Sequence, residues 1–393
     1  MGYDEATAQK IAYQINSGYW KVFNRCFFDK AECLRFASSI RNYQVTYHFY
    51  DEVYTTIDWT KSPEQSLDSM YADRAQKIRD KYDYIALLFS GGCDSTNMLK
   101  TFLKNGIKVD EVISFSPIEA SDKLLHTFNR NDTSCQNLIF EYYEAIVPAL
   151  DYLKIHHPEI KITVIDYTRP ALSFIESGLL EKLYISGVTA NGHTAGWYLS
   201  YKHVSKHDNA ALIIAIDKPR IMYDKTTKKF KSYFYDFNTI HGHFPKETFN
   251  GDQPATEYFY FDPEMPYIPV KQCKQLLPDL INLLDPNHPY HSQVLIDKGP
   301  KYIVDVHHSY IKQLLYPGWN TAIFQTDKPN SNFFFEMNNW MLKTDLTNKK
   351  VKDFAIGQGK ELAHGIDSKF VTYDDNGVPH KLLDMFTKSN PIH

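Results

Sequence analysis

The sequence predicts an α/β fold in which a parallel five-stranded sheet is flanked by helices, and two observations support this prediction. First, short apolar runs without regular polar alternation recur along the chain, as in strands that are buried on both faces. Second, longer segments that can form helices separate these runs, and such alternation implies right-handed crossovers between parallel strands. The expected strands are residues 84–89, 109–115, 160–165, 183–185 and 211–216.

Helices are expected before and after the first of these strands. Residues 66–82 show apolar side chains at helical spacing. The segment that follows the first strand does the same, and it ends at Asn105-Gly106, a typical stop signal for a helix. Further helices are expected at residues 191–203 and 270–284.

Segments of different character flank the predicted sheet, which occupies residues 72–220. Residues 1–71 are rich in aromatic and charged side chains and are expected to form a helical preface. Residues 221–393 form a mixed region, in which a hairpin with the basic tip 225–229 is followed by mostly helical segments. We expect this last region to shape the side of the site that binds an acceptor.

Composition narrows the functional classes. The 393 residues carry a formal net charge of -4, which argues against a broad non-specific surface for nucleic acid. The five cysteines are scattered without a C-x-x-C pair, which favours a reducing compartment. No apolar run reaches membrane-spanning length, so we expect a cytoplasmic protein that does not enter the membrane. The sequence carries no signal for an oligomeric state.

Ser90, Gly91 and Gly92 lie between the first predicted strand and the helix that follows it. Adjacent glycines allow the backbone to turn with its N–H groups exposed, and the N-terminal end of a helix attracts an anion. A phosphate chain is therefore the expected ligand of this loop. The familiar phosphate-binding loop that ends in Lys-Ser or Lys-Thr is absent, as is G-x-G-x-x-G.

The stretch SGGCDST resembles the signature of the N-type ATP pyrophosphatases, the PP-loop superfamily that includes asparagine synthetase, GMP synthetase and NAD synthetase. The matching positions are Ser90, Gly91, Gly92, Asp94, Ser95 and Thr96. A looser similarity that includes residues 257–263 extends to phage-encoded, asparagine-synthetase-like PP-loop proteins of unknown substrate. The resemblance implies an adenine nucleotide alpha-hydrolase-like fold, ATP and Mg2+ as cofactors, and a place in the host cytoplasm.

The carboxyl ends of the other predicted strands provide further candidates, because ligands of parallel sheets bind at that edge. The second strand ends at Ser114, Phe115 and Ser116. The resemblance implies that this position contacts adenine and ribose. The three residues are therefore expected to bind the nucleotide together with the loop.

Asp217 and Lys218 follow the last predicted strand. An acid and a lysine there can hold magnesium and balance the charge that develops as pyrophosphate leaves. We therefore expect Asp94 and Asp217 to bind the metal. Catalytic roles are assigned to Asp217, Lys218 and Lys271. The alternative for Asp217 is a surface ion pair with Arg220, which would contribute little.

Together these features predict an AMP-forming ligase with ATP pyrophosphatase chemistry. It would adenylate a carboxylate, carbonyl or amide oxygen of a small-molecule acceptor, release pyrophosphate, and transfer the activated group to a nitrogen donor. The segment before the sheet is too short for the glutaminase domain of asparagine synthetase. The alternatives are modification of a nucleobase or nucleic acid, served by the basic hairpin, and a non-catalytic ATP-binding module. Reduction of an activated sulfate is disfavoured because no reactive cysteine lies near the end of the sequence.

Overall fold

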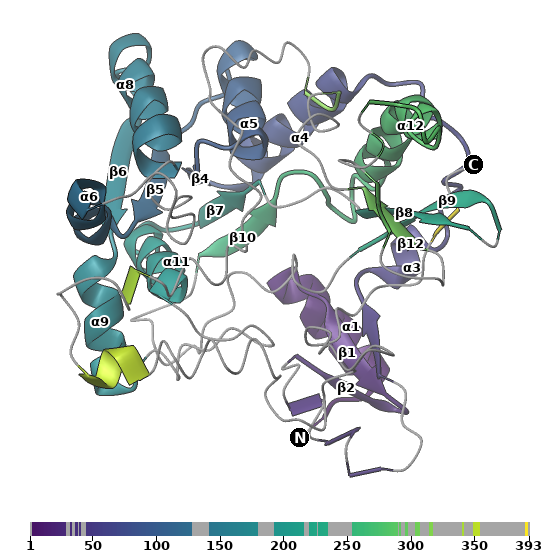
Figure 1. Cartoon of the computed structure of the whole chain (residues 1–393), viewed down its shortest axis with the longest axis horizontal. Helices are drawn as coiled ribbons and strands as arrows, with labels where there is room; N and C mark the ends of the chain where they lie inside the picture. The colour runs from purple at the N-terminus through teal and green to yellow at the C-terminus, as the bar shows by residue number, and fades with distance from the viewer. Residues whose placement is uncertain are drawn as a thin grey trace.

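A computed structural model describes residues 2–28, 32–33, 36–37, 39–40, 45–127, 141–179, 192–215, 220–225, 227–234, 254–289, 291, 295–297, 303–306, 314–316, 340–341, 349–353 and 390–391. At its centre lies a parallel five-stranded sheet of order β10-β7-β4-β5-β6, which confirms the predicted fold class (Figure 1). Its strands are β4 (Tyr84–Leu88), β5 (Glu111–Ser116), β6 (Lys161–Asp166), β7 (Ala210–Ile214) and β10 (Ala255–Tyr258).

The fifth strand differs from the predicted one. Residues 183–185 lie outside the described residues, and the observed fifth strand, β10, comes from beyond the predicted boundary at residue 220. It pairs in parallel with β7, where Tyr258 lies opposite Ile214. The sheet is therefore completed by a segment that was assigned to the C-terminal region.

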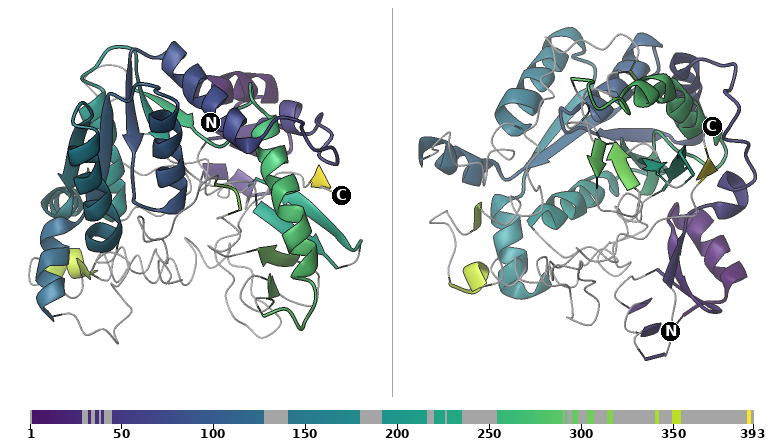
Figure 2. Two further views of the ribbon diagram at one scale, coloured as in Figure 1. Left: turned by 90° about the horizontal axis from the view of Figure 1, so that it is seen from above. Right: turned by 45° about the vertical axis from the view of Figure 1, so that its right-hand side comes forward.

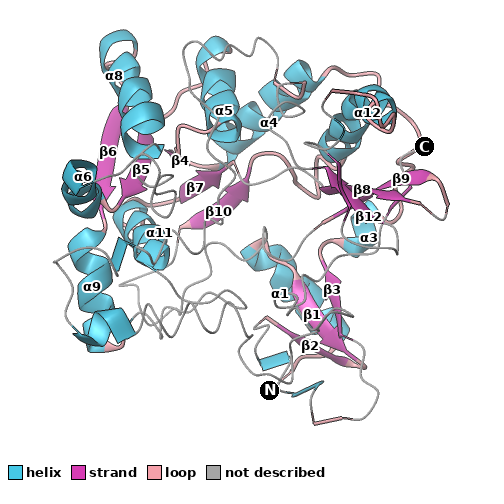
Figure 3. Cartoon of the chain, in the orientation of Figure 1, coloured by secondary structure: helices cyan, strands magenta, loops and turns pink. Residues whose placement is uncertain are grey.

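Helices cover both faces of the parallel sheet (Figures 1 and 3). On one side lie α4, α5 and α8, where α4 packs on α5 and α5 contacts β4. On the other side lie α9 and α11, and α11 contacts β5, β6 and β7. The bounds are α4 (Leu67–Lys81), α5 (Cys93–Lys104), α6 (Ile118–Thr127), the π-helix η2 (Glu141–Ile146), α8 (Val147–His156), α9 (Thr168–Ser177) and α11 (Gly192–Val204).

A second five-stranded sheet, of order β11-β12-β8-β9-β13, is built from antiparallel pairs. It contains the predicted hairpin, formed by β8 (Arg220–Asp224) and β9 (Lys229–Tyr233), with β11 (Leu295–Asp297), β12 (Ile303–Val306) and β13 (Asn390–Pro391). Helix α12 (Tyr267–Asn282) lies beside this sheet (Figure 2). The described part of the C-terminal region therefore mixes helix and sheet, in line with the predicted mixed region.

The N-terminal segment is not simply helical as predicted. Helix α1 (Glu5–Ile15) is followed by a three-stranded antiparallel sheet of order β2-β1-β3 and by the short helix α3 (Asp51–Tyr54). The strands are β1 (Tyr19–Val22), β2 (Arg25–Phe27) and β3 (Val45–His48). Aromatic side chains such as Trp20 and Tyr47, whose ring centroids lie 5.4 Å apart, favour a pleated sheet over a helix here.

One hydrophobic core joins the three segments. The ring of Phe49 lies 5.4 Å from that of Phe261, and the ring of Tyr54 lies 4.6 Å from that of Phe234. The same cluster of buried side chains extends into the parallel sheet and α12. None of the helices in the described part of the chain combines the length and the apolar composition needed to cross a membrane.

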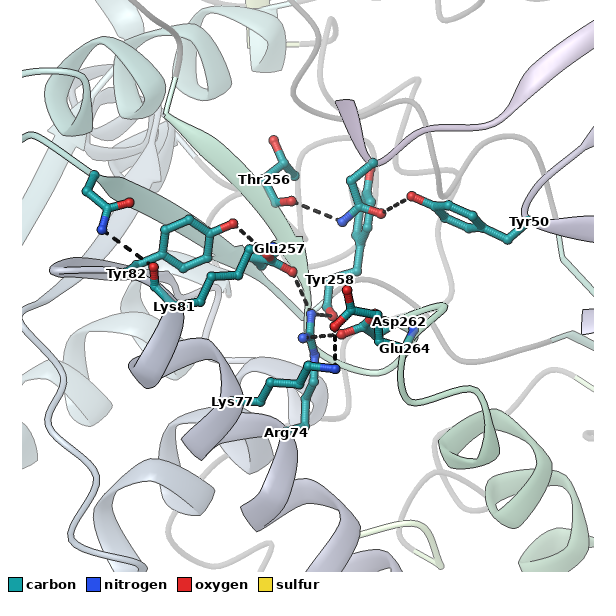
Figure 4. Close-up of polar contacts among 12 residues, drawn as sticks. Tyr50, Arg74, Lys77, Lys81, Tyr82, Thr256, Glu257, Tyr258, Asp262 and Glu264 are labelled. Atoms are coloured by element: carbon teal, nitrogen blue, oxygen red, sulfur yellow. Dashed lines mark hydrogen bonds and ion pairs between the residues drawn. The ribbon is translucent and has the colours of Figure 1, made fainter. Parts of the chain in front are cut away.

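A buried charged network fastens β10 to α4 (Figure 4). Arg74 donates hydrogen bonds to the carboxylates of Glu257 and Asp262 and to the carbonyl oxygen of Tyr258. Glu257 also accepts from Lys81 at 2.7 Å and from the Tyr82 hydroxyl at 2.6 Å. Because these buried charges are paired and hydrogen-bonded, we assign the network a structural role.

Candidate functional site

The candidate site lies where the strand order of the parallel sheet reverses. From β4 the chain continues to β5 and β6 on one side, whereas β7 and β10 lie on the other side of β4. Ligands of such sheets bind in the crevice outside the carboxyl ends of the strands at this switch point. Residues 89–92 leave β4 at that position, so the topology places the predicted loop there independently of its sequence signature.

The two glycines of the loop have different roles. Gly91 has a φ of 68°, in the left-handed region that glycine adopts without strain. A Cβ atom at this position would lie 2.6 Å from the backbone carbon of Ala145 in η2, so the loop packs directly against this π-helix. Gly92 has a φ of -73° and a ψ of 165°, which any residue can adopt, and it is the N-cap of α5. Gly92 is therefore the better position for testing the loop by substitution.

Ser95 shapes the loop from within. Its hydroxyl accepts a hydrogen bond from the Ser90 amide at 3.3 Å and donates one to the Gly92 carbonyl oxygen at 3.1 Å. Thr96 is completely buried, and its hydroxyl has no hydrogen-bond partner among the described residues. Ser90, Gly92 and Asp94 are only partly buried. These three are the predicted loop residues best placed to meet a ligand.

The N-terminus of α5 differs from those of two other helices that begin at the same edge of the sheet. In α6, the amides of Ile118 and Glu119 donate to the carboxylate of Asp166 at 3.0 and 3.1 Å. In α9, the amide of Thr168 donates to that same carboxylate at 2.9 Å. The N-cap of α5, Gly92, has no side chain with which to cap its helix. An anion from outside the chain can therefore bind at the N-terminus of α5, as the carboxylate of Asp166 does at α6 and α9.

Two tyrosines that the sequence did not indicate contact Asp94. The hydroxyl of Tyr316 donates to Asp94 Oδ1, and the hydroxyl of Tyr260 donates to the Asp94 carbonyl oxygen at 2.7 Å. Burial, and then the negative charge of Asp94, raise the pKa of both hydroxyls well above the usual range, so both remain protonated donors. Tyr260 lies in the segment 257–263 that extended the family resemblance, whereas no local pattern marks Tyr316.

The residues expected to contact adenine and ribose are mostly engaged in packing. The hydroxyl of Ser114 donates to the Phe89 carbonyl oxygen at 2.7 Å, directly before the loop. Phe115 packs its ring 5.5 Å from that of Trp197 and faces α11. Ser116 is buried at the end of β5. Ser114 therefore supports the loop from within the sheet, and partly buried Phe115 is the most accessible of the three.

Lys271, which was predicted to be catalytic, lies on α12 and contacts another part of the chain. Its ammonium donates to the Pro63 carbonyl oxygen at 2.7 Å, so it holds α12 against the segment that precedes α4. Asp217 and Lys218, which follow β7 in the sequence, lie outside the described residues. Within the described ranges, no three His, Cys, Asp or Glu side chains gather into a group that could hold a metal. Among the described residues, Asp94 is the predicted magnesium ligand, and phosphate oxygens would supply further ligands, a mode typical of this cation.

Comparison with known proteins adds no assignment. No protein-family model matches this chain, and no curated protein matches its sequence.

Proposed function

We propose that this chain is a cytoplasmic, AMP-forming ATP pyrophosphatase of the PP-loop type that joins an acceptor to a nitrogen donor. The observation that carries the proposal is the N-terminus of α5. It lies at the switch point of a parallel sheet with a glycine N-cap, whereas the carboxylate of Asp166 accepts hydrogen bonds from the first two amides of α6 at the same edge. This arrangement suits the phosphate chain of a nucleotide.

The loop residues have distinct roles in this proposal. The backbone at Gly91 and Gly92 and the first turn of α5 would bind the β- and γ-phosphates. Ser90 would add a hydroxyl donor, and Ser95 keeps the loop in shape. Asp94 would hold magnesium, which supplies positive charge for phosphate oxygens when it is bound. Thr96 is buried and would support the turn by packing inside the protein.

Asp217 and Lys218, which follow β7 in the sequence, are also assigned to the proposed site. We assign Asp217 to magnesium together with Asp94, and Lys218 to the negative charge on departing pyrophosphate. Lys271 is left out of this site because its ammonium binds the Pro63 carbonyl oxygen. Phe115 remains the candidate for contact with the adenine ring, since an aromatic face suits a base.

The proposed reaction has two steps. An oxygen of the acceptor attacks the α-phosphorus of ATP, and the bond from that phosphorus to the bridging oxygen breaks, so that pyrophosphate leaves with the electron pair. The nitrogen donor then attacks the activated carbon, the bond between that carbon and the oxygen of AMP breaks, and the nitrogen releases a proton to solvent. Positioning and electrostatics can carry both steps without a covalent side-chain nucleophile.

A second candidate is modification of a nucleobase or nucleic acid through the same activation. The observation in its favour is the hairpin of β8 and β9, whose tip exposes Lys225, Lys228 and Lys229. A basic tip of this kind can contact phosphates of a nucleic acid. Reversing these three charges would abolish activity on a nucleic-acid acceptor and leave activity on a small acceptor unchanged.

The test is chromatography of labelled ATP incubated with the protein, magnesium, ammonia and a panel of acids, amides, nucleobases and oligonucleotides. We expect AMP and pyrophosphate. Lys218→Ala should slow turnover about a hundredfold, equivalent to ~3 kcal/mol of transition-state stabilisation. Lys10→Ala is the matched control, since it removes an exposed lysine from α1, outside both the loop and the hairpin. ADP with free phosphate would overturn the proposed reaction, whereas ATP binding without turnover on any acceptor would favour a binding module.

A further inference from the structure

Asp94 is contacted at two points by tyrosines from distant parts of the chain. Tyr316, which is 222 residues away in sequence, donates to its carboxylate, and Tyr260 donates to its backbone carbonyl oxygen. The two rings lie 6.0 Å apart, and both side chains are almost completely buried. The first turn of α5 is thus held by the C-terminal part of the chain and by the segment that follows β10.

Both tyrosines are themselves held in place. The Asn97 side-chain amide donates to the Tyr260 hydroxyl at 3.0 Å. The hydroxyl of Tyr71 donates to the Leu315 carbonyl oxygen at 3.2 Å and accepts from Gln272 at 3.0 Å. The backbone next to Tyr316 is therefore attached through Leu315 to α4 and α12.

A neutral donor affects a carboxylate differently from a cation. A lysine or arginine at the position of Tyr316 would neutralise Asp94 and weaken its attraction for a metal ion. A protonated tyrosine leaves the negative charge in place and restricts the orientation of the carboxylate. Such contacts to metal-binding side chains typically change metal affinity or activity by about 10- to 100-fold.

We propose that Tyr316 is a positioning residue, which orients the carboxylate of Asp94 toward the divalent cation of a bound nucleoside triphosphate. This inference rests on the proposed function, and it assigns the C-terminal part of the chain a role in assembling the nucleotide site. Tyr316 would act through Asp94, the carboxylate to which its hydroxyl donates.

The test uses the full-length chain and the variant Tyr316→Phe, which removes the hydroxyl and keeps the ring. Tyr201→Phe is the matched control, because this buried tyrosine hydrogen-bonds Thr256 at 2.8 Å in the core. Calorimetry with ATP is performed with and without Mn2+, and unfolding by urea is followed in parallel. We expect Tyr316→Phe to weaken Mn2+-dependent ATP affinity about 10- to 100-fold and to change metal-free affinity less than about threefold. Tyr201→Phe should affect neither affinity.

The outcomes separate this inference from the proposed function. If the unmodified chain binds ATP neither with nor without Mn2+, the proposed function fails and this inference fails with it. If the unmodified chain binds Mn2+-ATP and Tyr316→Phe binds it equally well, only this inference is overturned. Tyr316→Phe could instead lose metal-free and Mn2+-dependent ATP affinity to the same extent and also be less stable. The Tyr316 hydroxyl would then have only a structural role, and this inference would again be overturned.

Discussion

Arg74 of α4 donates a hydrogen bond to Glu257 of β10 at 2.7 Å, and the two side chains are only 2% and 6% exposed. The same guanidinium contacts Asp262, just beyond the strand. Edge strand β10 is thus attached to the helical layer by buried charges as well as by its pairing with β7. Removing one member of such a group leaves the remaining charges buried without compensation.

Arg74→Met is therefore expected to lower the free energy of unfolding by about 3–5 kcal/mol. The control is Lys77→Met on the same helix, whose partner Glu264 is 69% exposed. Lys77→Met should lower the free energy of unfolding by less than about 1 kcal/mol, because solvent screens an exposed ion pair. The measurement is equilibrium unfolding in urea. Equal losses in the two variants would contradict the assigned role of the buried network.

Glu257 makes part of this stability dependent on pH. Its burial raises the pKa of the carboxyl, but Arg74, Lys81 and Tyr82 outweigh burial, and the pKa lies below its ordinary value of 4.5. A depressed pKa means that the contribution to stability is present above about pH 4.5 and is lost as the pH falls through the lower, folded-state pKa. Glu257→Gln should therefore differ most from the unmodified chain near pH 7, and the difference should shrink in acid. Unfolding free energies measured from pH 7 to pH 3 test this, and a difference that grows in acid would refute it.

Gly92→Asp should separate nucleotide binding from folding. An aspartate at this N-cap can accept hydrogen bonds from the first-turn amides of α5, so stability should stay within about 0.5 kcal/mol of the original. Its negative charge would take the place of a phosphate, and affinity for Mg-ATP should fall at least about tenfold.

Gly92→Asn is the matched control for this substitution, because asparagine caps a helix similarly without carrying a charge. It should lose less affinity than Gly92→Asp. Calorimetry with Mg-ATP and thermal unfolding give the two quantities. Unchanged affinity in Gly92→Asp would exclude this helix terminus as the phosphate site.

Asp166→Ala should destabilise the fold without weakening nucleotide binding. It removes the carboxylate that accepts the first two amides of α6, and a lost cap typically costs about 1 kcal/mol, so the expected loss is about 1 kcal/mol. Asp4→Ala, which removes the side-chain cap of α1, is the matched control for the loss of one cap. Urea unfolding measures both variants. An Asp166→Ala protein that remains folded but binds Mg-ATP much more weakly would indicate that Asp166 belongs to the ligand site.

Local patterns in the sequence were sufficient to predict the secondary structure around the loop. The uninterrupted apolar run of β4, the glycine pair and the helical spacing of α5 are encoded within residues 84–106, and the structure confirms this strand, turn and helix. The hairpin of β8 and β9 was predictable for the same reason, because its two strands are adjacent in sequence. Chemistry assigned to the loop, including ATP and magnesium, stays a prediction.

Only the tertiary structure decided which distant segments complete the sheet and the site. Strand β10 pairs with β7 across a long intervening segment. The four residues Ala255–Tyr258 are too few for their sequence to predict which strand they pair with. Tyr260 and Tyr316 reach Asp94 from 166 and 222 residues away, and their local sequence carries no periodicity that points to it. Asp166 ends strand β6, and its carboxylate accepts hydrogen bonds from amides at the start of α6, which lies 48 residues away in sequence, as well as from Thr168. Secondary structure follows from neighbours in sequence, whereas the partner of a buried hydroxyl or carboxylate is set by how the whole chain packs.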